Sequence, residues 1–320
     1  MTWVTPSDAA ADGVTLVTGH QPVMGTHLDL QITASTPALA EAADAAAVAE
    51  ARRLQACFTV FDPASELCRW RSGELAAPGP ELAGLLVLAS DWQGWSGGAF
   101  NPLAGVLTER WLLATVQGVE PSADELADLA ASIGAPRWMV TDGRVDRIGD
   151  CSATDLNALA KGHVVESVAA HLMAGHEVTR LVVNAGGDLV HRGDGVLRVA
   201  VEDPLRPYDN TPPLTRIEVR NAAVATSGRS RRWFEIGGTR RSRVLDPRTG
   251  RPVEHTASAT VVAPDAATAD ALATVTSVLT PPESMALVAG LRAEGLEVAA
   301  LVIDADGTGH PSAGWEALVV

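Results

Sequence analysis

The order of helical and extended segments most strongly limits the fold of this chain. Segments with helical composition lie at residues 36–57, 82–95 and 156–174. Beyond Ala174 most segments are short and rich in valine, isoleucine and threonine, which is typical of strands. Because strands and helices do not alternate regularly, a doubly wound parallel sheet is not favoured. The order predicts an α+β fold of mixed or antiparallel sheets flanked by helices.

Turn signals indicate how some of the strands pair. Residues 14–33 are expected to form a first pair of strands. Two strand-like segments flank Gly237–Gly238, which is a good hairpin signal. A closing hairpin is expected from residues 297–304 and 315–320, with Asp306–Gly307 in its turn.

The composition is that of a folded globular protein, and 320 residues could form one large domain or two smaller ones. Of the 320 residues 47% are apolar, so the chain can bury a substantial core. We expect a single domain over residues 1–320, with residues 1–13 as a flexible N-terminus. The net charge of −15 argues against nucleic acid or anionic membranes as partners, because both require basic surfaces. No apolar stretch reaches the roughly 18 residues that a membrane span needs.

The three cysteines, Cys57, Cys68 and Cys151, form no CxxC pair and have no metal-ligand spacing. An odd number of cysteines is typical of reduced, buried thiols. The N-terminal residues contain neither the positively charged start nor the apolar run of a signal peptide. The sequence therefore predicts a cytoplasmic protein.

A carboxylate and a hydroxyl lie four residues apart in the alanine-rich segment 269–274. Asp270 and Thr274 share one face of the predicted helix, because a helix turns every ~3.6 residues. Two hard oxygen ligands at this spacing suit Mg²⁺, which takes one or two protein carboxylates and completes its shell with water and phosphate. The alternative is an ordinary polar helix face.

Other segments allow both a functional and a structural interpretation. Glycines in the turn 184–188 let backbone N–H groups approach a ligand, although paired glycines also form simple turns. Lys161 lies in a predicted helix and is either solvated or part of a site. Gly162 follows it, and a glycine inside a helix lowers its stability, so a packing or ligand contact is expected to require it. The segment 226–228 is either a strand-end turn or a ligand contact. Ser65 and Glu66 either cap a short turn or line a cleft.

In their order these segments resemble the ApbE family, the FAD:protein FMN transferases. The resemblance extends from Met24 to about Leu279. It rests on collinear motifs that the chain carries as Met24-Gly25-Thr26, Ser65-Glu66-Leu67, Gly98-Ala99-Phe100-Asn101-Pro102 with Leu107 and Trp111, Asp155-Leu156 with Ala160-Lys161-Gly162, Asn184-Ala185-Gly186-Gly187-Asp188, Thr226-Ser227-Gly228, Asp246-Pro247-Arg248-Thr249-Gly250 and Ala269-Asp270-Ala271-Leu272-Ala273-Thr274.

The resemblance implies an ApbE-like fold and a flavin site. Proteins of this family bind FAD, hold its pyrophosphate on Mg²⁺, transfer FMN to a threonine hydroxyl of a flavoprotein partner and release AMP. We therefore expect an acceptor flavoprotein with an exposed threonine or serine. The matching magnesium ligands are Asp270, Thr274 and the backbone carbonyl of Ala160. The matching FAD-binding residues are Met24, Ser65, Glu66, Asn101, Lys161, Gly186, Gly187, Asp188, Thr226, Ser227 and Gly228.

The chain departs from the family at a catalytic position. Arg243 stands where the family usually has a histidine. The residues that the resemblance implies as catalytic candidates are Arg243 and Asp270. Arginine cannot act as a base near neutral pH, but it can bind phosphate and stabilise charge. Asn101 replaces a family aspartate. Two nearby histidines are open to interpretation: His255 as a substitute for the missing imidazole, and His163 as a packing or surface residue.

Three functions are compatible with these residues. The first is a Mg²⁺-dependent FAD:protein FMN transferase. The second is an FAD pyrophosphatase that gives FMN and AMP, with water in place of the acceptor hydroxyl. The third is a non-catalytic FAD-binding protein. The intact Asp270/Thr274 pair favours catalysis, whereas Arg243 favours the binding protein.

Overall fold

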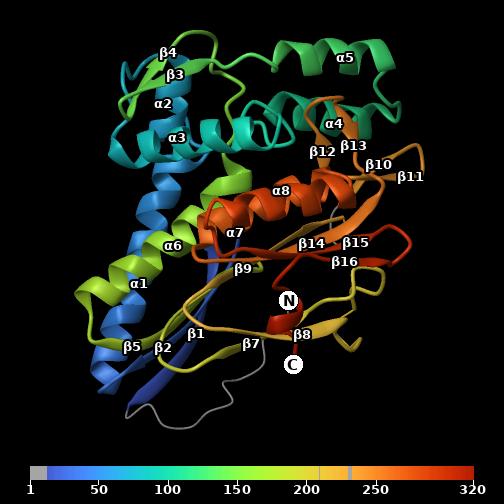
Figure 1. Cartoon of the computed structure of the whole chain (residues 1–320). Coiled ribbons are helices and arrows are strands. Elements are labelled where there is room, and N and C mark those ends of the chain that lie inside the picture. The colour runs from blue at the N-terminus through green and yellow to red at the C-terminus, as the bar shows by residue number, and fades with distance from the viewer. Residues whose placement is uncertain (1–12, 209, 230–232) are drawn as a thin grey trace.

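A single eight-stranded sheet forms the centre of the molecule. The computed structural model describes residues 13–208, 210–229 and 233–320. Every neighbouring pair of strands in the sheet is antiparallel (Figure 1). The strand order is β1 (Val14–Val23), β2 (Thr26–Ala34), β5 (Val178–Ala185), β6 (Asp188–Gly193), β9 (Ala223–Gly228), β14 (Thr256–Ala263), β15 (Ala299–Asp304) and β16 (Gly309–Pro311). The predicted α+β class is confirmed. Of the predicted flexible N-terminus, all but Gly13 lies outside the described residues.

Three helices cover one face of this sheet. α1 packs against β1 and β2, α6 against β5 and β6, and α7 against β9 and β14. α8 packs against β15 and β16 and also contacts α7, whereas α2 and α3 lie outside this layer and contact α1 and α6 respectively (Figure 1). The bounds are α1 Pro37–Phe58, α2 Glu66–Ser72, α3 Pro80–Trp95, α4 Gly105–Gln117, α5 Ala123–Ser132, α6 Asn157–Gly175, α7 Ala266–Val278 and α8 Pro281–Ala293. In the part of the chain that the structure describes, we find no helix long and apolar enough to cross a bilayer.

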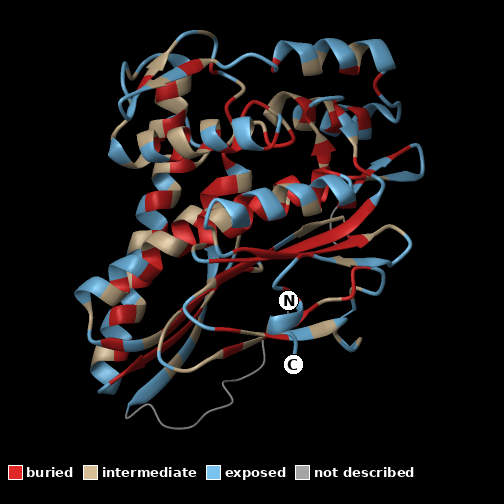
Figure 2. Cartoon of the chain, in the orientation of Figure 1, coloured by how far each residue is buried: buried red, intermediate tan, exposed pale blue. Residues whose placement is uncertain are grey.

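Both faces of the sheet are buried along its inner strands, whereas the edge strands β1 and β16 are largely exposed (Figure 2). Successive strand residues point to opposite faces, so Val182 belongs to one core and Val183 to the other. The helices bury the first face, and the hairpin of β7 and β8 contributes to the core of the second. Within the described ranges, small two-stranded sheets are formed by β3 (Trp138–Thr141) with β4 (Arg144–Arg147), β7 (Leu197–Val201) with β8 (Thr215–Val219), β10 (Trp233–Ile236) with β11 (Thr239–Ser242), and β12 (Leu245–Asp246) with β13 (Arg251–Pro252).

The expected helix at residues 36–57 corresponds to α1, and local chemistry explains where it begins. The Thr36 hydroxyl accepts a hydrogen bond from the Leu39 N–H, and Pro37 occupies the first turn, where its missing N–H has no consequence. Its buried face includes Ala43, Ala47 and Ala51, spaced one helical turn apart. Small side chains at this spacing let the helix lie close to the sheet.

The predicted closing hairpin was wrong in its second strand. The turn contains Gly307 with φ +94° as expected, but the chain pairs again with β15 immediately, through β16 at Gly309–Pro311. Residues 315–320 therefore do not form that strand, and Glu316–Leu318 is a 3-10 helix. Trp315 packs instead into the core on the second face of the sheet. The predicted hairpin at Gly237–Gly238 is confirmed, with Ile236 opposite Thr239 in the register.

Candidate active site

A stripe of polar side chains runs along the otherwise apolar helix α7. Every residue of this helix except Thr268 and Thr274 is buried, and most are alanine, leucine or valine. Asp270, Thr274 and Ser277 are spaced by four and three residues, so they lie on one face over about 10 Å of the helix. Helical periodicity in the sequence predicts the Asp270/Thr274 pair. Ser277 was missed, although continuing the same periodicity would have found it.

Two buried carboxylates meet the ammonium of Lys161 at the start of this stripe. Lys161 on α6 donates a hydrogen bond to Asp188 Oδ2 at the start of β6, and its Nζ lies 3.4 Å from Asp270 Oδ1. Burial, followed by the Asp188 carboxylate, raises the pKa of Asp270 above its usual range. Burial also opposes the charge of Lys161, but the Asp188 and Asp270 carboxylates outweigh it and raise the pKa of the ammonium. The Lys161 side chain keeps 35% of its exposure, but its ammonium is paired with these two carboxylates.

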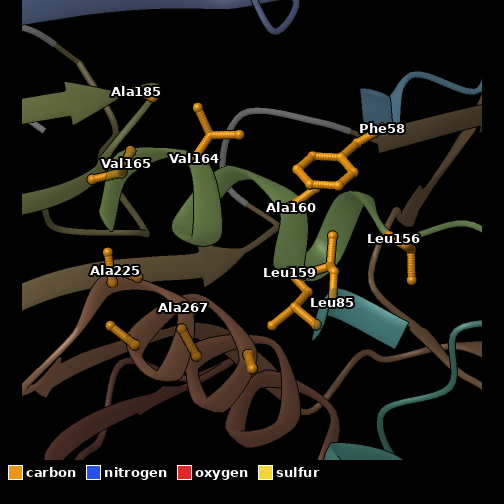
Figure 3. Close-up of a cluster of buried hydrophobic side chains, with 14 of the residues drawn as sticks. Phe58, Leu85, Leu156, Leu159, Ala160, Val164, Val165, Ala185, Ala225 and Ala267 are labelled. Carbon is orange, nitrogen blue, oxygen red and sulfur yellow. The ribbon is translucent and has the colours of Figure 1, made fainter. Parts of the chain in front are cut away.

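Gly162 fixes the position of the Asp270 carboxylate. Its backbone N–H donates to Asp270 Oδ2 at 2.9 Å. A Cβ atom at this position would overlap the carbonyl oxygen of Ala266 and lie 2.7 Å from Asp270 Cβ. α6 and α7 therefore approach so closely that only glycine fits between them, and Figure 3 shows the small side chains of Ala160 and Ala267 on these two helices. This close packing explains a glycine that otherwise costs helix stability.

The glycine turn between β5 and β6 lies against the turn between β1 and β2. Gly186 and Gly187 have φ values of +63° and +106°, which only glycine adopts readily. A Cβ on Gly186 would lie 2.6 Å from the Thr26 hydroxyl, and the Gly187 N–H donates to Asn184 Oδ1 at 3.0 Å. Met24 has φ +54°, and its N–H donates to Gln55 Oε1 at 2.6 Å. The structure thus joins two predicted ligand segments that are far apart in the chain.

The segment Thr226–Gly228 ends strand β9 at the far end of the α7 stripe. The Ser277 hydroxyl donates to the Ser227 hydroxyl at 3.2 Å, and the Thr226 and Thr260 hydroxyls are 2.9 Å apart. A Cβ on Gly228 would lie 2.6 Å from the Ala257 carbonyl oxygen, so the close pairing with β14 requires glycine. Hydroxyl groups therefore extend from Thr274 on α7 to the end of strand β9.

Three of the predicted FAD-binding side chains form hydrogen bonds with backbone groups of the protein itself. The Ser65 hydroxyl caps α2 by accepting from the Cys68 N–H at 3.1 Å. Glu66 Oε1 accepts from the Gly79 N–H at 2.5 Å. Asn101 donates to the Ile133 carbonyl at 3.0 Å and accepts from the Leu103 N–H at 2.9 Å. The turn-capping interpretation of Ser65 is confirmed, and a flavin contact of these residues stays a prediction.

A large cavity adjoins the Asp246–Gly250 turn rather than the α7 stripe. It has a volume of about 1020 Å³ and lies between α3, α5 and this turn. Asn101, Arg248 and Arg251 are among its lining residues. Within the described part of the chain, Lys161, Asp188 and Asp270 do not line it. No pattern in the sequence indicates this cavity, because residues from several separate segments enclose it.

The catalytic candidate Arg243 is exposed where the chain leaves β11. Its guanidinium carbon lies 5.1 Å from the centre of the Phe234 ring, and it makes no ion pair among the described residues. His255 Nε2 lies 3.2 Å from the Leu279 carbonyl oxygen, just beyond the end of α7. His163 packs edge-on against Phe58 at 5.5 Å, and burial lowers its pKa, as expected of a packing histidine.

The donors around Asp270 fit Mg²⁺. Asp270 Oδ2 is bound to a backbone N–H, whereas Oδ1 makes only the long contact with Lys161 among the residues that the structure describes, which leaves lone pairs for a ligand. Thr274 adds a hydroxyl on the same face, and Ala160 precedes Gly162 by two residues in α6. Oxygen atoms of these types are the ligands that Mg²⁺ prefers. Among the described residues, no group of three or more histidines, cysteines or acidic residues could hold a metal ion, so a magnesium site here depends on Asp270 with neutral oxygen donors.

Comparisons with known proteins show which family the chain matches. Residues 24–300 match the model of the ApbE family. The chain is 30% identical over 283 residues to a protein named FAD:protein FMN transferase from Rhodobacter capsulatus, covering 82% of this chain and 53% of the relative. It is 35% identical over 157 residues to the Escherichia coli K12 protein of the same name, covering 48% of this chain and 43% of the relative. The chain therefore spans about half the length of these curated relatives.

Solved structures share the fold over nearly the whole chain. The ApbE protein of Thermotoga maritima superposes with a TM-score of 0.81 at 24% identity, covering 95% of this chain and 99% of that one. A mutant of flavin transferase ApbE from Vibrio cholerae superposes with a TM-score of 0.77 at 26% identity, covering 96% and 100%. The antiparallel sheet with its helical layer is therefore an arrangement found in proteins of this name.

Proposed function

The chain belongs to the ApbE family, and on this basis we propose that it is a Mg²⁺-dependent FAD:protein FMN transferase. The observation that carries the proposal is the buried Asp270 carboxylate, held by Gly162 and Lys161 at the start of the α7 stripe. The relatives bear the name of this activity. The acceptor is a flavoprotein with an exposed threonine or serine.

The proposed reaction exchanges the phosphoanhydride bond of FAD for a phosphoester bond to the acceptor. The acceptor hydroxyl oxygen attacks the FMN phosphorus of FAD, and the bond from that phosphorus to the bridging oxygen breaks. AMP leaves with the bridging oxygen, and the hydroxyl proton passes to solvent or to a base. Bound Mg²⁺ would neutralise charge on the pyrophosphate, with Asp270, Thr274 and the Ala160 carbonyl as its protein ligands.

The chain's own residues supply the binding and the positioning. Lys161 offers a cation beside the phosphates while Asp188 holds it in place. The backbone N–H groups of Gly186 and Gly187 approach the ligand without side chains between them. The hydroxyls of Thr226 and Ser227 stand at the other end of the stripe. These roles rely on positioning and charge stabilisation, which dominate catalysis of phosphoryl transfer.

One observation favours a second function. Arg243 replaces the family's histidine, and a guanidinium cannot remove a proton from the acceptor hydroxyl near neutral pH. A protein with this arginine is suited to holding FAD without transferring FMN. An FAD pyrophosphatase is the third possibility, since water needs no acceptor site.

Incubation with FAD and Mg²⁺, with and without an acceptor flavoprotein domain, separates the three functions. We expect an acceptor that becomes covalently flavinylated, seen as in-gel flavin fluorescence, together with an equimolar amount of AMP. AMP release that does not depend on the acceptor would indicate the pyrophosphatase. Tight FAD binding without turnover over hours would leave only the binding protein.

Replacing Arg243 by histidine is expected to raise the rate of FMN transfer by about 10-fold or more. An imidazole titrates near neutral pH and can accept the hydroxyl proton. General base catalysis of this kind typically raises reaction rates by a large factor. Initial rates of acceptor flavinylation measure the effect. Arg216→His, at an exposed position of β8, is the matched control and should leave the rate unchanged. A lower rate in Arg243→His would mean that the arginine has a catalytic role of its own.

A further inference from the structure

Helices α6 and α7 lie side by side and exchange hydrogen bonds between carboxylates and backbone at two places (Figure 1). At one place the Gly162 N–H of α6 donates to the Asp270 carboxylate of α7 at 2.9 Å. At the other, the Ala266 N–H at the start of α7 donates to Glu166 Oε2 of α6, also at 2.9 Å. On each helix the two residues involved are four positions apart and therefore lie on one face. The two bonds together fix the position of α7 along α6.

An arginine of the neighbouring strand holds the Glu166 carboxylate. Arg192 Nη2 on β6 donates to Glu166 Oε1 at 2.6 Å and to Oε2 at 2.8 Å. It also donates to the Pro264 carbonyl oxygen at 2.9 Å, two residues before α7 begins. The side chains of Arg192 and Glu166 are only 19% and 25% exposed, and charge-assisted hydrogen bonds of this kind are strong. Glu166 is thus held in the position from which it accepts the bond from the start of α7.

The same three elements carry the charged residues of the proposed site. Each of these elements contributes one residue to the site and, four or five positions away, one residue to a second cluster: Lys161 and Glu166 on α6, Asp188 and Arg192 on β6, and Asp270 and Ala266 on α7. We call Glu166, Arg192 and Ala266 the Glu166 cluster. Contacts at two separate places prevent the three elements from rotating about a single one. A displacement in the Glu166 cluster would therefore also displace the site.

The position of the Asp270 carboxylate depends on how α7 lies on α6. Among the described residues, one short hydrogen bond holds it, from the Gly162 N–H, whereas the Lys161 ammonium lies 3.4 and 3.5 Å from its two oxygens. Ala266 is only 1% exposed, so without Glu166 water has little access to its N–H. In that case we expect the start of α7 to move toward solvent, and Asp270, one turn further along, to move with it.

We propose that Glu166, held by Arg192, is a positioning residue that places Asp270 for the metal ion by fixing the start of α7 against α6. The proposal rests on the transferase function, in which Asp270 binds Mg²⁺. Glu166 acts through the backbone of α7 and is not itself a ligand. Replacing a residue that orients a metal ligand commonly changes metal affinity by about 10- to 100-fold.

Glu166→Ala is expected to weaken Mn²⁺ binding to the FAD-saturated protein by about 10-fold. Mn²⁺ accepts the same oxygen ligands as Mg²⁺, and electron paramagnetic resonance measures the free ion, with FAD alone as the background. Glu166→Gln keeps an oxygen for the Ala266 N–H and loses only the charge opposite Arg192, so it should recover most of the affinity. Equal Mn²⁺ affinity in Glu166→Ala and the wild-type protein would overturn the proposal.

Glu283→Ala is the matched control for a general loss of stability. Glu283 likewise accepts a hydrogen bond from a backbone N–H at the start of a helix, that of Thr280 before α8, at 2.9 Å. Urea unfolding should show a lower midpoint for both variants, since each loses such a bond. Only Glu166→Ala should bind Mn²⁺ more weakly. Equal losses of Mn²⁺ affinity in the two variants would contradict a positioning role, because lower stability alone would then explain them.

The amide signal of Gly162 gives a readout that requires neither metal nor turnover. In assigned ¹H–¹⁵N correlation spectra of the metal-free protein, we expect Glu166→Ala to shift this signal, because its N–H is bonded to the Asp270 carboxylate. Glu283→Ala should leave it in place. An unchanged signal with unchanged Mn²⁺ affinity would reject the positioning role and retain the magnesium site. A shifted signal in Glu166→Ala, together with a wild-type protein that binds no Mn²⁺, would support the control of Asp270 by Glu166 and reject the proposed function.

Discussion

Asp270→Asn is expected to lower Mg²⁺-dependent FMN transfer by on the order of 10³-fold while the protein stays folded. Asparagine keeps the size of the side chain and an oxygen for the Gly162 N–H, but it removes the charge that would hold the metal ion on the pyrophosphate. Loss of one charge-stabilising group in an active site commonly costs a factor of this size. The measurements are acceptor flavinylation and AMP release over a range of Mg²⁺ concentrations.

The same substitution is not expected to destabilise the fold. Burial and the Asp188 carboxylate raise the pKa of Asp270, which means that the folded protein disfavours its charged form. A neutral asparagine relieves that repulsion and leaves Lys161 paired with Asp188. Thermal unfolding should therefore occur at the same temperature or higher. Asp203→Asn neutralises another buried carboxylate, one paired with an arginine, and as the control it should retain turnover. Unchanged turnover in Asp270→Asn would rule out the magnesium site.

Gly162→Ala is expected to destabilise the protein by about 2–3 kcal/mol, a typical loss when a core is overpacked. The added methyl group would overlap the Ala266 carbonyl and approach Asp270 Cβ, both on α7. To make room, α6 and α7 must separate, and the Asp270 carboxylate moves with them. Alanine favours the helix by about 1 kcal/mol relative to glycine, so the predicted loss is what remains after that gain. Urea unfolding curves measure the change in the free energy of unfolding.

A second helical glycine provides the matched control. Gly290 lies in α8 and is exposed, and no neighbouring atom lies within 4 Å of the position that an added methyl group would occupy. Gly290→Ala should therefore stabilise the protein by up to about 1 kcal/mol. Opposite signs for the same substitution would show that the contact between α6 and α7 requires Gly162. A stabilising Gly162→Ala would instead mean that these helices can separate at little cost.

Local sequence chemistry was sufficient to predict features that depend on a single helix or turn. The spacing of Asp270 and Thr274 requires only helical periodicity, and Thr36 with Pro37 marks the start of α1. The cost of Gly162 in a helix already pointed to a packing or ligand reason. In each case the relevant interaction lies within a few residues or within one repeating pattern.

Features that depend on distant segments were not accessible in the same way. The bond between Lys161 and Asp188 joins a helix to the start of a strand, and nothing in either segment specifies the partner. Residues 315–320 have the composition of a strand, but β16 had already taken the edge of β15. The cavity beside the Asp246–Gly250 turn is formed by residues from several elements. All three features are determined by tertiary packing between segments that are distant in the sequence.

Lys161 is the only lysine in the chain, and apart from the histidines all other basic residues are arginines. The chain therefore has a single side-chain amine that an acylating reagent could modify, and that amine is partly buried between Asp188 and Asp270. A reagent selective for amines would report on this one position, with only the α-amino group as a second target. Protection of Lys161 from acylation, read from the mass of the intact protein, would then count occupied sites without any knowledge of the acceptor.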